Sequence, residues 1–439
     1  MKHRRWTLVS LAIAMVLAAV FLAKAIEGPP APTALAVHVV TDHGVDQVTA
    51  HLILPRDPRT GPRKPGLAHY LEHLVWLGLR PASDAGPDRQ SNAWTNRYAV
   101  GYWLSGPPDA LPDLLARLVG VFDPLAPPPA VADQERGIVL REYEARQVGR
   151  LRNRINHQMS DFLYQGAPLA DSIIGTPDQI AAFDLAQARA LHALTHRPDK
   201  GRLVVTGPIS ERRVHAGLAA IPLLAHATDG PPGRPGLPPL QADRLHLSAG
   251  EDTTVPTLIW RKVVALPEPM GFDLLEARSA LLSDILDSGL PGGLAGPLRF
   301  DEDLARSFHI AVFPLDTTHV EISLSAHPSG DVTLRDLERA VRTTLDDIAR
   351  RGIPADTHDR LRARFEGFWP DWTDPDDTAA WMAAYTVDRL AVLRDPLPQD
   401  ALRYLDAQLT RDGTNALLTA LAGPGREAVA HLSPNGASL

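Results

Sequence analysis

The sequence predicts an α+β protein made of two similar domains. Three observations lead to this fold class. The chain of 439 residues is long enough for two or three domains. Strand-like and helix-like patterns alternate along both halves of the chain. Residues 225–243 are rich in Pro and Gly, which break helices and strands, so we expect a linker there between domains at 26–224 and 244–439.

The first 25 residues are expected to lie outside the fold. A basic start is followed by an apolar run without a charge at residues 7–23. The run is long for a signal peptide and short for a spanning helix, so a cleaved signal ending near residue 25 and an uncleaved anchor both stay open. Either one predicts an exported protein, periplasmic or anchored to the membrane by this segment, because the basic start stays on the cytoplasmic side.

Composition excludes two classes of site and one class of partner. Hydrophobic residues make up 44% and charged residues 22% of the chain, as in an ordinary globular protein. The chain has no Cys, which excludes disulfides and thiolate metal sites. Removing residues 1–25 removes four basic and no acidic residues, so the formal charge moves from −8 to −12. An acidic body argues against nucleic acid as a partner.

Periodicity and turn residues predict several strands and helices of the first domain. Residues 26–33 form a Pro-rich tether, and apolar runs between turns predict the strands that follow it. Asp109 followed by Pro112 suits the start of a helix. We expect strands at 34–40, 47–54, 98–104 and 202–206, the last closing the sheet, and helices at 109–122 and 182–194.

A metal-binding helix is predicted at residues 66–74, which contain His-x-x-Glu-His, the inverted form of a zinc signature. Positions three and four apart share one face of a helix, so His69 and His73 can bind one metal ion together. Glu72 lies on the same face and can act on a water at that metal. The opposite face is apolar and suits a core, and Gly78 is expected to end the helix.

A second helix carries two acidic residues at a helical interval. Glu135 and Glu142 are seven residues apart, which is two turns, so both lie on one face. A site with two histidines needs a third protein ligand. We therefore expect that ligand in this stretch of the chain.

His-x-x-Glu-His followed by this Glu pair resembles the pitrilysin family, the insulinase-type zinc peptidases that include insulin-degrading enzyme and mitochondrial processing peptidase. The resemblance implies that Glu142 completes the zinc site with His69 and His73. It implies that Glu135 belongs to the catalytic set as an acid that orients a ligand or balances charge. It further implies mixed sheets covered by helices, and a chain that forms half of a clamshell.

Three further segments resemble the family in the same order along the chain. Ser-Asn-Ala-Trp-Thr at 91–95 is similar to an edge strand that pairs with the substrate backbone, which implies that Asn92 and Ala93 bind substrate. Ile-Gly-Thr-Pro-Asp at 174–178 is similar to the start of a family helix. Residues 196–207 are similar to an Arg-Pro turn followed by a Val-rich strand.

The second half repeats the order of elements without the metal motif. Strands are expected within 244–266 and at 308–313 and 320–326, and helices at 272–287, 331–351, 355–368 and 376–392. The resemblance implies a domain that lost its metal.

The family's second half carries an Arg and, seven residues later, a Tyr that contact substrate. Arg299 stands at the Arg position, but Arg306 stands where the Tyr belongs and Asp303 where a Gly is usual. Arg299 is therefore expected to bind substrate. Without the resemblance it would be interpreted as a surface salt-bridge residue.

These observations predict a zinc endopeptidase that hydrolyses extended or unfolded peptides, with one Zn²⁺ per chain and Glu72 as the base that activates water. The rival interpretation is a non-catalytic scaffold or assembly subunit of a peptidase-like complex. Relatives of that kind usually show a broken metal motif, whereas this motif is intact.

The missing Tyr bears on assembly. Related enzymes enclose substrate between two halves, in one long chain or in a dimer of short chains, and this chain has the short length. A homodimer supplies Arg299 from a second copy but no Tyr. A related chain that carries both residues supplies what is missing, so we expect a heterodimer, with a homodimer as the alternative.

Overall fold

The computed structural model of the protein describes residues 35–56, 63–79, 90–147, 151–223, 236–251, 255–367 and 369–434. The predicted N-terminal segment at 1–25 and much of the expected linker lie outside these residues. Among the described residues, none of the helices has the length and apolar character needed to span a bilayer. Residues 236–242, the described end of the expected linker, form neither helix nor strand.

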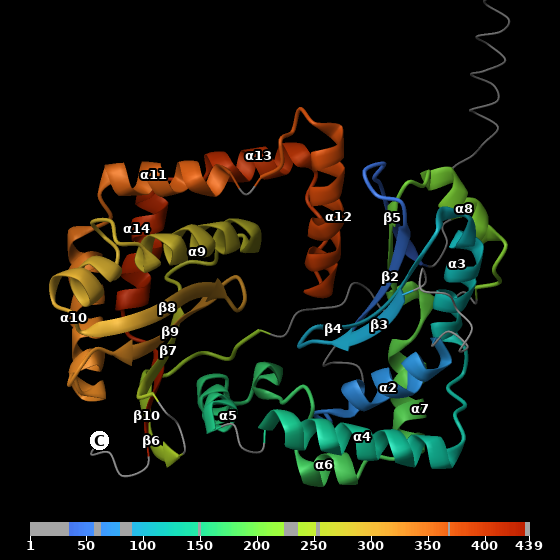
Figure 1. Ribbon diagram of the computed structural model, residues 1–439, viewed down its shortest axis with the longest axis horizontal. Coiled ribbons are helices and arrows are strands. Elements are labelled where there is room, and N and C mark those ends of the chain that lie inside the picture. The colour runs from blue at the N-terminus through green and yellow to red at the C-terminus, as the bar shows by residue number, and fades with distance from the viewer. Residues whose placement is uncertain are drawn as a thin grey trace, which may run out of the picture.

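The chain folds into two five-stranded mixed sheets with the same topology (Figure 1). The orders are β1-β5-β2-β4-β3 and β6-β10-β7-β9-β8, so in both sheets the last strand in sequence lies between the first and the second. In both sheets it pairs in parallel with the first strand and antiparallel with the second. This shared topology confirms the predicted α+β class and the two similar halves.

The strands have the following bounds. The first sheet consists of β1 (Ala36–Thr41), β2 (Val48–Pro55), β3 (Gln90–Thr95), β4 (Ala99–Gly106) and β5 (Arg202–Gly207). The second consists of β6 (Asp243–Glu251), β7 (Thr257–Ala265), β8 (Ala305–Pro314), β9 (His319–Pro328) and β10 (Arg426–Pro434).

Helices cover both sheets. In the first half they are α2 (Leu67–Leu79), α3 (Leu111–Val119), α4 (Pro129–Gln147), α5 (Leu151–Leu163), α6 (Pro177–Ala181), α7 (Leu185–Thr195) and α8 (Glu211–Ala219). In the second half they are α9 (Phe272–Asp287), α10 (Leu334–Arg351), α11 (Ala355–Glu366), α12 (Pro375–Ala391), α13 (Gln399–Ala407) and α14 (Arg411–Ala422). A π-helical turn spans Gly296–Asp301.

Two parts of the sequence prediction need correction. The strand predicted at 202–206 does not close the sheet at an edge, because β5 lies inside it between β1 and β2. The elements α13, α14 and β10 were not predicted. Strand β10 begins with two charged residues after a Gly-Pro-Gly turn at 423–425. This polar start made the strand difficult to predict from the sequence, although its later residues are buried.

The two halves exchange helices, in the sense that one helix of each half covers the sheet of the other half. In Figure 1, α12 of the second half stands beside the first sheet, and α5 of the first half lies against the second sheet. Leu390 of α12 packs on Ile53, Ala99 and Val204, and the α5 residues Ile155, Met159 and Leu163 share a cluster with β7 and β10. Strands β2 and β5 are therefore covered on both faces, which explains the apolar runs at 52–54 and 203–205.

A buried polar network fixes α5 to the second sheet. Arg261 on β7 pairs with Glu321 on β9 at 2.6 Å and donates a hydrogen bond to the Tyr164 hydroxyl at 2.8 Å. Tyr164 in turn donates to Glu321, which is fully buried. Arg261 also donates to Ser160 Oγ of α5 at 2.9 Å. Because buried charges are stable only when paired and hydrogen-bonded, this network holds α5 in one place.

Candidate metal centre

Two glycines set where α2 begins. Gly66 and Gly175 have φ angles of +86° and +88°, a left-handed conformation that glycine adopts without strain. A Cβ atom on Gly66 would lie 2.4 Å from the Ile174 carbonyl oxygen, so the two backbones touch. Thr176 and Gln179 form a capping box at the start of α6, as the sequence at 174–178 predicts.

Helix α2 has the two faces that its sequence predicts. Its apolar face, with Tyr70 and Leu71, is buried in the first core. The Tyr70 hydroxyl donates to the Ala132 carbonyl oxygen on α4 at 2.9 Å, which fixes α2 against α4. The helix continues through Gly78 and ends its described part at Leu79, one residue beyond the predicted stop.

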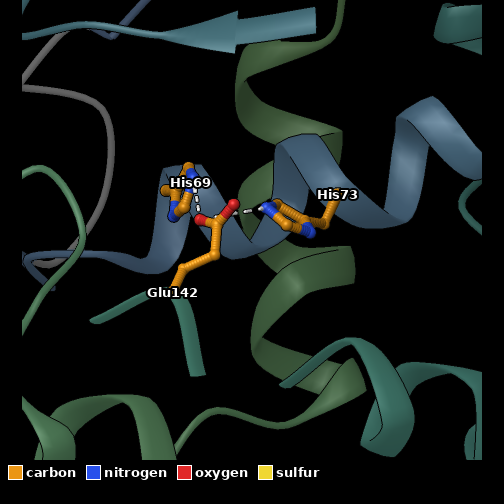
Figure 2. A group of neighbouring side chains, drawn as sticks. All are labelled: His69, His73 and Glu142. Carbon is orange, nitrogen blue, oxygen red and sulfur yellow. Dashed lines mark ion pairs between the residues drawn. The ribbon is translucent and has the colours of Figure 1, made fainter. Parts of the chain in front are cut away.

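The polar face of α2 meets α4 at one point. Figure 2 shows the Glu142 carboxylate between the imidazole rings of His69 and His73. Glu142 Oε2 lies 3.5 Å from His69 Nε2 and 3.9 Å from His73 Nε2, and one ligand atom from each of the three residues lies within 4.8 Å of the other two. The structure thus brings together the three predicted ligands.

The two other predicted acids flank this cluster. Glu135 Oε2 lies 3.1 Å from His73 Nδ1, and with a neutral imidazole that nitrogen donates to the carboxylate, leaving Nε2 to face Glu142. Glu72 Oε2 lies 4.0 Å from His69 Nε2 and accepts a hydrogen bond from the Thr95 hydroxyl at 3.1 Å. Glu72 therefore sits beside the cluster rather than within it.

The donor set fits a zinc ion. Tetrahedral Zn²⁺ with bonds to nitrogen and oxygen of about 2.0–2.2 Å holds its ligand atoms about 3.4 Å apart, close to the two distances from Glu142. Three carboxylates and two histidines gather in a space where the side chains of His69, Glu72 and Glu135 are about nine-tenths buried. A cation bound among these residues would neutralise this concentration of negative charge.

A second cluster of potential ligands in the other half is occupied by arginines. His246, Glu338 and His431 also lie within 4.8 Å of one another. Glu338, however, accepts hydrogen bonds from Arg244, Arg342 and His431. Although burial opposes the change, the bonds from His431 and Arg342 lower the pKa of Glu338 to about 2. This cluster forms an ion-pair network in place of a metal site.

A cavity of about 790 Å³ opens beside the metal centre. The predicted substrate residues Asn92 and Ala93 of β3 line it together with all five predicted metal-centre residues. Strand β3 lies at the edge of the first sheet, as its sequence predicts.

Arg299 does not lie in this cavity. It occupies the π-helical turn at 296–301, where its guanidinium stacks over Phe300 at 5.4 Å. Arg306 is exposed on the edge strand β8. Asp303 has a φ of 48°, a left-handed conformation that accounts for the glycine expected there and that Asp tolerates better than most residues.

Sequence reasoning missed the opposite wall of the cavity. Helix α5 contributes Asn153, Asn156, His157 and Ser160, and Arg97 follows strand β3. The spacing of these α5 residues places them on one helical face, and that polar stripe was the available signal.

A buried hydrogen-bonded pair lies behind the centre. The Tyr102 hydroxyl on β4 forms a hydrogen bond with His196 Nε2 at 2.9 Å. Burial and, to a smaller extent, the nearby Glu72 carboxylate raise the pKa of Tyr102, whereas burial and neighbouring His192 lower the pKa of His196. Both groups are therefore neutral. Through this pair, the predicted segment at 196–207 contacts β4 behind the candidate site.

Comparison with known proteins agrees with this architecture. No protein-family model matches the chain. A curated relative, the coenzyme PQQ synthesis protein F of Pseudomonas aeruginosa, is 28% identical over 325 residues, which cover 67% of this chain and 39% of the relative. The chain thus spans about two fifths of that relative's length.

Solved structures match the fold over most of the chain. The periplasmic protease PqqL from Escherichia coli has a TM-score of 0.73 and 16% identity, over 91% of this chain and 46% of that one. A peptidase M16 inactive domain from Pseudomonas fluorescens has a TM-score of 0.66 and 17% identity, over 92% of this chain and 97% of that domain. The chain therefore has the pitrilysin-type fold of peptidase family M16.

Proposed function

We propose that this protein is a zinc-dependent endopeptidase that cleaves extended peptides or unfolded segments of polypeptide. The observation that carries the proposal is the convergence of His69, His73 and Glu142 at the wall of a cavity, with Glu72 beside them. The pitrilysin-type fold supports the same conclusion.

His69, His73 and Glu142 would hold one Zn²⁺ per chain. When bound there, the ion supplies Lewis acidity, which makes water a stronger nucleophile at neutral pH and polarises a peptide carbonyl. Glu135 keeps the His73 ring in the orientation and tautomer that binding requires. Glu72 accepts the proton of the attacking water and returns it to the leaving amine.

The free edge of β3 would hold the peptide. Among the described strands, β3 pairs with β4 alone, so its other edge is open to an added strand. The Ala93 N–H donates to the side chain of Asn92 at 2.9 Å instead of to a neighbouring strand. A peptide carbonyl could replace that side chain, which supports extended rather than folded substrates.

Zinc removal tests the proposal. We expect purified protein to bind one zinc per chain and to cleave a quenched-fluorescence unstructured peptide. A chelator should abolish cleavage, and added zinc should restore it. Metal content is measured on the same samples. Cleavage that persists in metal-free protein would contradict the proposal.

The alternative function is a scaffold without catalysis. The match to an inactive domain and Arg306 in place of the family Tyr favour it. A scaffold predicts that zinc-loaded protein cleaves no peptide, alone or with a partner, so the same measurements separate the two functions.

We further propose that the protein is exported and works with a second pitrilysin-type half. The apolar run at residues 7–23 supports export. The chain matches 46% of PqqL, and Arg299 lies outside the cavity of its own chain. A related chain with both Arg and Tyr would contribute these residues from across the chamber.

The partner proposal predicts weak activity for the chain alone. Light scattering gives its mass, and peptide cleavage is measured before and after adding a related chain that carries Arg and Tyr but no zinc motif. We expect cleavage to rise on mixing, with an extensive interface between the halves. Full activity of the lone chain or its homodimer would rule out the partner.

A further inference from the structure

We propose that Arg97 forms a subsite for an acidic side chain of the peptide, close to the bond that is cleaved. This inference rests on the proposed peptidase function and adds a substrate class to it, namely peptides with Glu or Asp near the cleavage point. Arg97 lines the same cavity as the metal centre but belongs to neither the metal ligands nor the predicted substrate strand.

Arg97 is held close to the reacting groups by a rigid turn. Strand β3 ends at Thr95, whose hydroxyl donates to Glu72. Two residues span at most about 7 Å between Cα atoms, so the backbone of Arg97 is close to Thr95, and both Arg97 and Glu72 line the cavity. Asn96 fixes the turn, because its side-chain oxygen accepts from the N–H groups of Tyr98 and Ala99 at 2.7 and 2.8 Å.

The Arg97 guanidinium has no counter-charge within the described part of the chain. It stacks over the Tyr164 ring at 5.6 Å, and its Nη1 atom is buried without a hydrogen bond. A second guanidinium, that of Arg56, lies near it. Burial and, in smaller part, the charge of Arg97 lower the pKa of Arg56 to about 10, although Asp171 opposes this. A second positive charge therefore lies close to Arg97.

The nearest carboxylates are already engaged. Asp171 lines the same cavity but accepts hydrogen bonds from Nε and Nη2 of Arg63 at 2.6–2.9 Å. Glu321, beneath Tyr164, pairs with Arg261. The acids of the candidate metal centre gather around the two histidines of α2, with Glu135 and Glu142 coming from α4. A half-buried arginine without an internal partner gains most when an anion arrives from outside.

A peptide on the β3 edge can supply that anion. Side chains of an added strand point alternately to the two faces of the sheet, so only certain positions of the peptide face α5 and Arg97. The subsite should therefore select an acidic residue at one position rather than favour acidic peptides in general. An Asp or Glu carboxylate accepts from a guanidinium in a strong, charge-assisted geometry.

Paired peptides test the subsite. Short unstructured peptides, blocked at both ends, carry one Glu that moves along the sequence, and each has a Gln counterpart. We expect one Glu position to raise kcat/KM by about 10-fold or more over Gln, the factor that one charge-assisted hydrogen bond gives. Arg97→Gln should remove this preference, so that each Glu peptide and its Gln counterpart are cleaved with equal kcat/KM. Arg97→Glu should prefer Lys at the same position.

Binding provides a readout that is independent of cleavage. Fluorescence anisotropy of the labelled peptides on the Glu72→Gln protein should show the same Glu preference, and Arg97→Gln added to that protein should abolish it. A preference in binding, together with no cleavage by the zinc-loaded wild type either alone or with a partner half, supports the subsite and contradicts the peptidase. Cleavage without any position-specific preference overturns the subsite and leaves the peptidase standing.

Arg212→Gln is the matched control, because it removes the same charge from an exposed position on α8. It should leave the Glu preference intact. Thermal unfolding of the Arg97 variants completes the set. If Arg97→Gln lowers the unfolding temperature but keeps the Glu preference, Arg97 only packs on Tyr164 and the proposal fails.

Discussion

Glu72→Gln is expected to keep zinc bound while peptide cleavage falls by about 10²- to 10⁴-fold, the usual contribution of a general base. Glu72 lies outside the group of three residues that we propose as ligands, so its replacement should leave those three in place. The amide oxygen can still accept the hydrogen bond from Thr95, which keeps the side chain in place. The amide cannot take up the proton of the attacking water.

Zinc content and kcat are measured on the same preparations of this variant. Glu144→Gln is the control, because Glu144 is exposed on the same helix as Glu142 and should have no effect. Near-normal cleavage by Glu72→Gln would refute the role of Glu72 as base. Loss of zinc would instead identify it as a ligand.

His73→Ala is expected to lose both zinc and cleavage. The substitution removes one of the three proposed protein ligands and also the partner of Glu135, so His69 is the one histidine left in the cluster. The buried face of α2, with Tyr70 and Leu71, is untouched. We therefore expect a folded protein without metal.

Metal analysis and circular dichroism of His73→Ala separate these effects. His215→Ala is the control, since His215 lies on α8, outside the cavity, and pairs only with Glu211 among the described residues. A His73→Ala protein with full zinc occupancy would disprove the ligand assignment. An unfolded protein would show that the centre is also structural.

The sequence predicted those features of the fold and site that depend on local spacing. The intervals between His69, Glu72 and His73, and between Glu135 and Glu142, are helical intervals, and helical geometry alone places each set on one face. That the two faces meet could be predicted only from the resemblance to known peptidases, because no local pattern specifies how α2 crosses α4.

Long-range features could not be predicted in this way. Arg97 and the polar face of α5 join the cavity because the second sheet holds α5 through Arg261 and Tyr164, far away in sequence. The exchange of α5 and α12 is likewise invisible to periodicity, since either helix could have covered its own sheet. Strand β10 was missed because its burial comes from its neighbours β6 and β7 and not from its own first residues.

The helix exchange also limits how far the protein can be taken apart. Neither half keeps all its covering layers when the other is removed, because α12 leaves with the second half and α5 with the first. A gene split between the two sheets would encode fragments that each expose a bare apolar sheet face. Such faces favour aggregation over independent folding. The half without a metal motif therefore supplies part of the covering layer of the half that has one, and both halves must be expressed in one chain to bury these faces.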